Sequence, residues 1–336
     1  MVGHRHSLAD SLYQGCKREK AVKFFFSTTG EKVENHEGSP SFTAVPRDGE
    51  PYTVKADVIL GADGIKSNTR VDMLRILGLT SDVTDTGQAA YRIMLTRDQM
   101  KDDPELLELL DADRVTRWIG EKRHIIAYPV AGKTIYNLST AQPDTNFAIA
   151  PSATYTTKGD KSAMLDVYGD FCPKVQRMLQ LVPEGEVCEW KLRVHAPLET
   201  WTHGSVTLVG DACHPTLPHL AQGAAQAIED AAVIGVVLSK IPDKSPQSIN
   251  KAFKCYEKAR KQRAETLVDL AAASGKALHL GEGKAKEERD KAFAALKEGK
   301  GPVPDKWADA DVQKMIYGVD IMKVAEEIFD QEFSKI

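Results

Sequence analysis

The sequence has few cysteines, and none of them form a recognisable pair. The five cysteines are odd in number and scattered along 336 residues, and no Cys-x-x-Cys motif occurs. Such a set is not a disulfide framework, so we expect reduced thiols and a cytoplasmic location. We also expect no secretory signal peptide, because the first residues printed are polar rather than a long apolar run.

Long apolar runs and a strong net charge are absent as well. The longest strongly apolar run, Ala231–Leu238, is far shorter than the roughly 20 residues that span a bilayer. A net charge of −4 gives no general attraction to nucleic acid or to anionic membranes. The spacing of His203, His214 and His219 follows no zinc-ligand template, so no metal is predicted. Charged residues at 27% and hydrophobic residues at 42% instead indicate a globular protein.

One stretch, residues 205–232, combines the features of a ligand site. Its first five residues predict a short buried strand that ends at Gly210. A loop with two prolines follows, and a helix is predicted from about Gln222. The unpaired N–H groups at the start of a helix attract anionic or electron-rich groups. Asp211 follows the carboxyl end of the strand, where open α/β sheets bind their ligands.

The predicted helix has apolar residues at helical spacing. Ile228, Ala231, Ala232 and Gly235 recur three or four residues apart, the spacing that predicts a helix. Gly223 stands at the start of the helix, where the absence of a side chain lets a ligand approach the backbone.

These residues resemble the Gly-Asp motif of the single-component flavoprotein aromatic hydroxylases, especially the fungal salicylate-hydroxylase-like branch. The resemblance implies that Asp211 hydrogen-bonds a ribityl hydroxyl of FAD. It also implies that the isoalloxazine ring is lined by Pro218 and, at the start of the helix, by Gly223 and Ala224; Gln222 is a further candidate for cofactor binding. The alternative is an ordinary strand–loop–helix packing unit without a ligand.

A second motif lies at residues 57–70, where a predicted strand runs into Gly61-Ala-Asp63-Gly64. Ser67 stands near a predicted helix start. The segment resembles the Asp-Gly motif of the same family, which implies that Asp63 lies near the flavin pyrophosphate and helps to engage NAD(P)H. Asp-Gly is also a common turn sequence, so a plain turn is the alternative.

The beginning of the chain resembles the His-Arg-x-x-Leu helix of the family, and this implies that Arg5 approaches the flavin pyrophosphate. A guanidinium suits that role because it stays charged and forks across two phosphate oxygens. The alternative is a solvated terminal arginine. Family members also carry a Gly-x-Gly-x-x-Gly turn that holds the ADP half of FAD, and residues 1–60 contain no such pattern. Either the chain is incomplete or the protein has lost this means of holding its cofactor.

The remaining elements are read from periodicity. Strands are predicted at residues 21–28, 41–45, 52–56, 87–95, 115–119, 123–129, 134–140 and 190–195, and helices at 101–110, 163–181 and 251–268. The family uses such a meander as its substrate domain. Its Tyr-Arg pair matches Tyr91 and Arg92, which implies contact with flavin or substrate; a structural pair on an edge strand is the alternative.

The expected fold class is α/β (α+β). An incomplete, Rossmann-like FAD-binding domain is expected at residues 1–80 and 201–245. A mostly antiparallel β-sheet substrate domain is expected as an insertion at 81–200, and a helical C-terminal region at 246–336.

The resemblance implies an FAD-dependent monooxygenase that uses NAD(P)H and dioxygen to hydroxylate a small aromatic or polyketide-like molecule, in fungal secondary metabolism. His219 is a candidate acid–base group because the pKa of imidazole is near neutrality. We expect a monomer or homodimer without a nucleic-acid partner. The alternative is a flavin-poor or flavin-free relative that acts as a cyclase or isomerase, or as an inactive binding protein.

Overall fold

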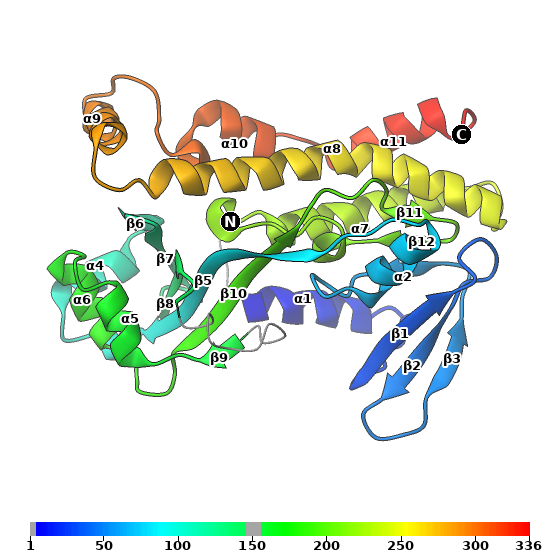
Figure 1. The fold of residues 1–336 in the computed structure, drawn as a ribbon, viewed down its shortest axis with the longest axis horizontal. Helices are drawn as coiled ribbons and strands as arrows, with labels where there is room; N and C mark the ends of the chain where they lie inside the picture. Colours follow the sequence, from blue (N-terminus) through cyan, green and yellow to red (C-terminus); the bar gives the residue numbers. More distant parts are fainter. Residues whose placement is uncertain (1–4, 146–155) are drawn as a thin grey trace. The chain divides into compact units, whose positions relative to one another are not determined.

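In the computed structural model, which describes residues 5–145 and 156–336, the chain divides into two units, each with its own sheets and core (Figure 1). Unit 1 consists of Met1–Phe24, Asp85–Leu192 and Leu278–Lys291. Unit 2 consists of Phe25–Thr84, Arg193–Ala277 and Ala292–Ile336. The chain combines helices with parallel and antiparallel strand pairs, which confirms the predicted mixed α/β class. The three domains expected from the sequence stay a prediction.

Unit 1 is built on a six-stranded sheet with the order β6-β7-β8-β5-β10-β9. Its strands are β5 (Val83–Thr96), β6 (Thr116–Gly120), β7 (Arg123–Val130), β8 (Ile135–Pro143), β9 (Thr156–Lys158) and β10 (Cys188–His195). The pairs β6/β7, β7/β8, β8/β5 and β10/β9 are antiparallel, which confirms the predicted meander.

Short helices cover one face of this sheet. They are α3 (Arg97–Met100), α4 (Pro104–Asp111), α5 (Lys161–Val167) and α6 (Pro173–Gln180); α1 (Arg5–Lys17) and most of α9 (Lys284–Lys297) also belong to unit 1. Leu106 of α4, Met164 of α5 and Met178 of α6 pack with Ile93 and Ile125 of the sheet in one buried cluster. This cluster is the core of unit 1.

Of two helices predicted in this unit, one is divided in the structure and the other begins later than predicted. The segment 163–181 forms α5 and α6, because Pro173 lacks an N–H and occupies the first turn of a new helix. The segment 101–110 begins as a turn, and Asp103 then caps α4 by accepting hydrogen bonds from the N–H groups of Glu105 and Leu106.

Unit 2 contains two three-stranded sheets, with the orders β1-β2-β3 and β11-β12-β4. The strands are β1 (Thr28–Glu34), β2 (Ser41–Pro46), β3 (Tyr52–Lys55), β4 (Ile59–Gly61), β11 (Thr202–His203) and β12 (Val206–Leu208). The first sheet is antiparallel, whereas β12 pairs with β4 in parallel, with Val206 opposite Ile59 and Leu208 opposite Gly61.

The strand predicted at residues 21–28 is wrong. The segment before Thr28 is irregular, and its side chains Phe25 and Phe26 are each 68% exposed. A β-strand requires a hydrogen-bonding neighbour. Only the part from Thr28 onward has one, because it pairs with β2.

The helices of unit 2 pack around a second core. They are α2 (Asn68–Ile76), α7 (Gly223–Ser239), α8 (Pro246–Leu278, all but its last residue), α10 (Ala310–Tyr317) and α11 (Ile321–Glu332). Trp201, Phe253 and Tyr256 are fully buried among them. Helix α8 extends the helix predicted at 251–268 in both directions (Figure 1).

The predicted helix α7 is confirmed, but the apolar residues that indicated it do not form its buried face. Ile228 is 44% exposed, and Ala231 and Gly235 are exposed too. The helix instead buries the opposite face, which includes Gln226 and Asp230. Apolar residues lie on both faces of this helix, so periodicity alone could not select one. The polar residues are buried because α8 supplies their hydrogen-bonding partners.

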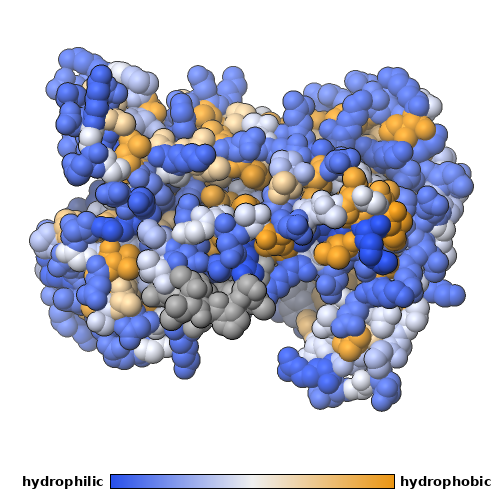
Figure 2. Space-filling view, in the orientation of Figure 1, coloured by the Kyte–Doolittle hydropathy of each residue, from blue (hydrophilic) through white to orange (hydrophobic). Residues whose placement is uncertain are grey.

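The surface is mainly hydrophilic on the face that Figure 2 shows, with apolar side chains interspersed. Within the described ranges, no helix combines the length and the hydropathy needed to cross a bilayer.

Candidate functional site

Two loops of unit 2 leave the same edge of a sheet. Because β4 and β12 run in parallel, the segment that carries Asp63 and the turn that carries Asp211 both follow the carboxyl ends of neighbouring strands. Open α/β sheets bind their ligands at this edge. The two motifs that the sequence analysis treats separately therefore lie at the same edge of one sheet.

The carboxylate of Asp63 holds the start of α2. Its Oδ1 accepts a hydrogen bond from the Ser67 hydroxyl at 2.5 Å, and its Oδ2 accepts from the N–H and the hydroxyl of Thr69, each at 3.0 Å. Ser67 in turn caps α2 by accepting from the N–H of Arg70. These contacts give Asp63 a clear structural role, and its contact with a cofactor stays a prediction.

The packing of Thr69 explains the glycine that ends β4. A Cβ atom at Gly61 would lie 2.6 Å from Cγ2 of Thr69, far closer than van der Waals contact allows. Gly61 therefore allows α2 to begin directly against the end of the strand.

A buried arginine joins the two loops, and the sequence analysis gave it no role. Arg70 is 1% exposed, and it donates to the carbonyl oxygen of Ile65 at 2.8 Å and to that of Ala212 at 3.2 Å. Ile65 follows the Asp63 motif, whereas Ala212 follows Asp211. The signal in the sequence was the Ser-x-x-Arg pattern, but the partner across the chain was not predictable from it.

The turn at Gly210 exposes the side chain that follows it. Gly210 adopts a φ of +62°, in the left-handed region that favours glycine, and a 3-10 helix covers Gly210–Ala212. Gly210 and Ala212 are buried, whereas Asp211 between them is exposed. A carboxylate held in this way suits the predicted hydrogen bond to a hydroxyl.

The start of α7 offers N–H groups that no capping side chain engages. Gln222 is the N-cap residue of α7, and its side chain makes no capping bond; its Nε2 donates instead to the Tyr317 hydroxyl at 3.3 Å. A Cβ at Gly223 would lie 3.2 Å from Cγ2 of Thr216, so the loop packs closely here, while Ala224 is exposed. An uncapped end of a 17-residue helix and an exposed carboxylate fit a ligand with both anionic and hydroxyl groups, such as FAD.

The loop before α7 contains the two remaining residues of this motif. Pro218 opens a 3-10 helix, Pro218–Leu220, and His219 within it is buried. The imidazole of His219 packs against α8, since a Cβ at Gly275 would lie 2.7 Å from its ring. The acid–base role of His219 stays a prediction.

Cys213, His214 and Asp230 converge closely enough to suggest a metal site. The carboxylate of Asp230, however, already accepts hydrogen bonds from Gly210 and Arg260 and is paired with His214. Burial raises the pKa of the Cys213 thiol well above its usual value, so the sulfur keeps its proton and is a poor metal ligand. The group therefore forms a hydrogen-bond network.

In unit 1, the predicted pair Tyr91 and Arg92 points in two directions. Neighbouring residues of a strand face opposite sides of a sheet. Tyr91 is fully buried in the core under the helices. Arg92 lies opposite Ser139 of β8, which lies opposite Ile126 of β7, so these three side chains share the other face.

The face of Arg92 carries further polar and aromatic groups. The Arg92 guanidinium carbon lies 5.5 Å from the ring centre of Trp190, a cation–π distance. Burial, and then the charge of Arg5, lower the pKa of Arg92, while Tyr128 acts in the opposite direction. Arg5 and Arg92, predicted for different roles, therefore interact electrostatically within unit 1.

A pair of histidines lies on the same sheet, and the sequence analysis did not identify it. His124 of β7 is two residues from Ile126 and so shares the face of Arg92. Its Nδ1 atom lies 2.6 Å from the Nε2 atom of His279, which follows α8. His279 is 155 residues away in sequence, so no local pattern could reveal the pair.

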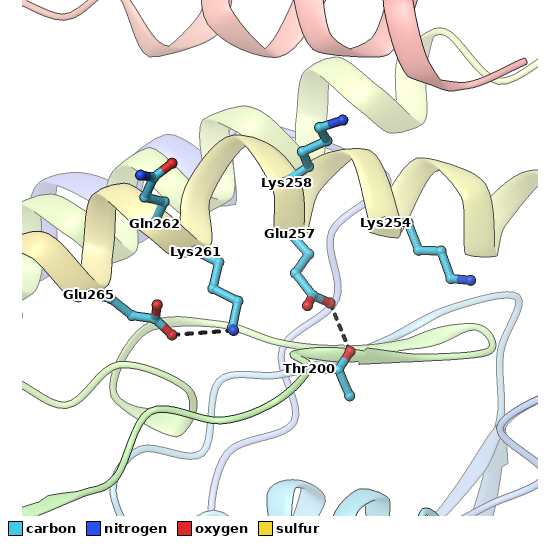
Figure 3. A pocket seen from close by; sticks show the side chains of 7 residues that line it. All are labelled: Thr200, Lys254, Glu257, Lys258, Lys261, Gln262 and Glu265. Atoms are coloured by element: carbon cyan, nitrogen blue, oxygen red, sulfur yellow. Dashed lines mark hydrogen bonds and ion pairs between the residues drawn. The ribbon is translucent and has the colours of Figure 1, made fainter. Parts of the chain in front are cut away.

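Two surface cavities are lined by residues other than those predicted for the site. One of about 430 Å³ runs along α8, and Figure 3 shows Glu257 reaching Thr200 and Lys261 reaching Glu265 within it. Another of about 690 Å³ lies between the β6/β7 hairpin and residues 280–286 of unit 1. Its Lys286 is paired with Glu282 at 2.5 Å. Neither cavity contains a residue predicted for the site.

A family model and proteins of known name match most of this chain. The family described as FAD binding domain matches residues 5–271. FAD-dependent monooxygenase ntnJ of Nectria sp is 36% identical over 237 residues, which are 70% of this chain and 54% of that protein. FAD-dependent monooxygenase OpS4 of Beauveria bassiana (strain ARSEF 2860) is 32% identical over 300 residues, 89% of this chain and 67% of that protein. The chain thus spans about half the length of the Nectria relative.

Among solved structures, a salicylate hydroxylase in complex with its substrate aligns with a TM-score of 0.76. The alignment covers 97% of this chain and 75% of that one at 23% identity, so this similarity concerns the fold.

Proposed function

Because the chain belongs to the FAD binding domain family, together with FAD-dependent monooxygenases, we propose that it serves in the hydroxylation of a small aromatic or polyketide-like molecule. NAD(P)H and dioxygen are the proposed co-substrates. One observation carries the proposal: the parallel pair β4/β12 brings the Asp63 and Asp211 loops to one sheet edge. The flavin-free alternative is not favoured, since the family match covers most of the chain.

The residues of unit 2 would hold the cofactor. Asp211 would accept a hydrogen bond from a ribityl hydroxyl, and the N–H groups at Gly223 and Ala224 would favour an electron-rich part of the ring system. Pro218 and Gln222 complete this loop, and Asp63 supports it from the neighbouring strand. Bound FAD supplies the activation of dioxygen, and the protein contributes orientation and the exclusion of water.

The residues of unit 1 would recognise the substrate. Arg92 provides a positive charge and Trp190 an aromatic surface, which together suit an aromatic acid or phenolate. This chemistry agrees with the aromatic acid in the name of salicylate hydroxylase. Arg5 adds positive charge near Arg92, and we propose that it attracts the anionic substrate or the pyrophosphate. His219 is the proposed acid–base group.

The compartment and the oligomeric state of the protein are also proposed. Five cysteines without a disulfide in the described structure support a reducing compartment such as the cytoplasm. The proposed oligomeric state is a monomer or a homodimer.

The test is a titration of the purified chain with FAD, followed by flavin absorption and fluorescence. The Gly-x-Gly-x-x-Gly turn would supply charge-assisted contacts worth about 1.5–3 kcal/mol each. Losing two or three of them weakens affinity by several orders of magnitude. We therefore expect a colourless or substoichiometric preparation that still binds added FAD saturably. A stoichiometric yellow protein would contradict the expected weakness, and an absence of saturable binding would contradict the function itself.

A further inference from the structure

The carboxylate of Asp230 is fully buried on α7 and is engaged at both oxygens. Its Oδ2 accepts a hydrogen bond from the N–H of Gly210 at 2.9 Å and lies 2.6 Å from Nε2 of His214. Its Oδ1 accepts from Nε of Arg260 at 2.8 Å. Gly210 and His214, from the loop that carries Asp211, and Arg260 of α8 therefore converge on the Asp230 side chain.

This carboxylate is held in its ionised form. Burial opposes the ionisation of Asp230, but His214 and Arg260 keep its pKa below the usual value. The Arg260 guanidinium is itself fully buried and also bonds Glu229 at 2.5 Å and the side-chain oxygen of Gln226 at 2.6 Å. An ionised carboxylate has no proton to donate and can accept from every N–H around it. A neutral replacement cannot do so.

The backbone of Gly210 is fixed from both sides. Its N–H donates to Asp230, and its carbonyl oxygen accepts from the N–H groups of Cys213 and His214, each at 3.0 Å. Asp211 follows directly and is exposed. The direction of the Asp211 side chain is therefore set by a glycine whose orientation depends on Asp230.

We infer that Asp230 is a positioning residue, which fixes the Gly210–Asp211 turn and thereby sets the affinity of Asp211 for a hydroxyl of the flavin chain. The inference rests on the proposed function for its ligand. The positioning itself is a property of the protein alone, and it is measured without flavin.

The decisive variant is Asp230→Asn. An amide presents one oxygen and one NH₂ group, so in either orientation it opposes a donor with a donor. Arg260 is a fixed cation and will attract the amide oxygen. The NH₂ group then faces the N–H of Gly210, which loses its acceptor.

A matched control lies next to it in the sequence. Glu229 bonds Arg260 and Arg263 but has no hydrogen bond to residues 210–214 among the contacts of the described chain. Glu229→Gln removes a charge of the same sign from the same helix and weakens the same arginine. Any effect on the turn that Asp230→Asn shows and Glu229→Gln lacks is therefore specific to Asp230.

The first measurement is amide hydrogen exchange by mass spectrometry on the peptide 206–217, without flavin. We expect exchange in this peptide to be at least tenfold faster in Asp230→Asn than in wild type, and unchanged in Glu229→Gln. Equal exchange in both variants would overturn the inference. So would an equal acceleration in peptides across all of α7 and α8, because that would indicate a general loss of stability.

The second measurement is the FAD titration of the same proteins. We expect the dissociation constant to rise about tenfold in Asp230→Asn and to stay within twofold in Glu229→Gln. If the wild type binds no FAD, the proposed function fails, but the exchange experiment still decides whether Asp230 positions the turn.

A second pair of variants keeps the test decisive if Asp230→Asn does not fold. The amide nitrogen of Gln lies close to the position of an imidazole Nε2, so His214→Gln can still donate to Asp230, whereas His214→Leu cannot. We expect exchange in the peptide 206–217 to be near wild type in His214→Gln and several-fold faster in His214→Leu. Equal exchange in these two variants would overturn the inference.

Discussion

The Nδ1 atom of His124 lies 2.6 Å from the Nε2 atom of His279, and their rings are tilted by 38°. One of the two nitrogens donates and the other accepts, so the pair shares a single proton. Burial, and then the charges of Arg117 and Arg289, lower the pKa of His279 to about 4. The His279 side chain is therefore neutral at pH 7 and can form this hydrogen bond with His124.

This pair predicts a specific loss of stability in acid. The pKa of His279 is about 4 in the folded protein and near 6.5 when unfolded. Between these values the unfolded chain binds a proton that the folded chain does not, so the free energy of unfolding falls as the pH drops. We expect urea midpoints to fall more between pH 7 and pH 5 in wild type than in His279→Gln.

The comparison is internally controlled. Burial also lowers the pKa values of His36 and His195, and these residues contribute equally to both proteins. The same loss of midpoint in wild type and in His279→Gln would rule out the contribution of His279.

Substitution of Asp211 tests the flavin contact directly. Asp211→Ala removes the proposed acceptor of a ribityl hydroxyl and barely disturbs packing, because the side chain is exposed. We expect FAD affinity to fall by about 1.5–3 kcal/mol, which is roughly a ten- to 150-fold rise in dissociation constant. Asp211→Asn keeps an oxygen acceptor without the charge, so its FAD affinity should lie between those of wild type and Asp211→Ala. Equal affinities across the three proteins would exclude the role.

Arg70 should be important for stability beyond its own helix. Arg70→Met deprives the carbonyl groups of Ile65 and Ala212 of a buried donor. We expect the free energy of unfolding to fall by about 1–3 kcal/mol, as for other buried polar groups left without partners. The control is Arg75→Met on the same helix, whose exposed pair with Asp72 should contribute less than about 1 kcal/mol. Urea denaturation measures both, and similar losses would contradict the bridging role.

The opposite orientations of Tyr91 and Arg92 predict opposite phenotypes. Tyr91→Ala opens a cavity in the core of unit 1 and should cost about 3–5 kcal/mol of stability, as for other large aromatic side chains. Arg92→Ala should change stability by less than about 1 kcal/mol, as at most surface positions. Arg92→Ala should instead weaken the binding of salicylate, used as a probe in a fluorescence titration. Tyr91→Phe, which keeps the ring, should bind salicylate like wild type.

The sequence was informative where function depends on local backbone geometry. The strand before Gly210, the cap at Ser67 and the start of α7 lie within one or two residues of their predicted positions. Each of these depends on neighbours within a few residues, such as a hydroxyl that caps a helix.

The sequence was not informative where a partner lies far along the chain. Arg70 bonds a carbonyl 142 residues away, and Arg260 bonds a carboxylate 30 residues away on another helix. The buried face of α7 was not predictable for the same reason, since Asp230 is buried with Arg260 and His214 as its charged and hydrogen-bonding partners. Long-range complementarity of charge leaves no periodic signal in a single sequence.

The parallel pairing of β4 with β12 also has a consequence for how quickly the protein folds. The chain between these two short strands includes the whole six-stranded sheet of unit 1, so their pairing closes a very long loop. Closing a loop costs entropy that grows with its length, whereas the hairpins β6/β7 and β7/β8 close over a few residues. We therefore expect the hairpins to form early and the β4/β12 pair late, with a rate set by this long-range search. During synthesis, the two loops that this pair brings together can meet only after the segment that contains β12 has left the ribosome.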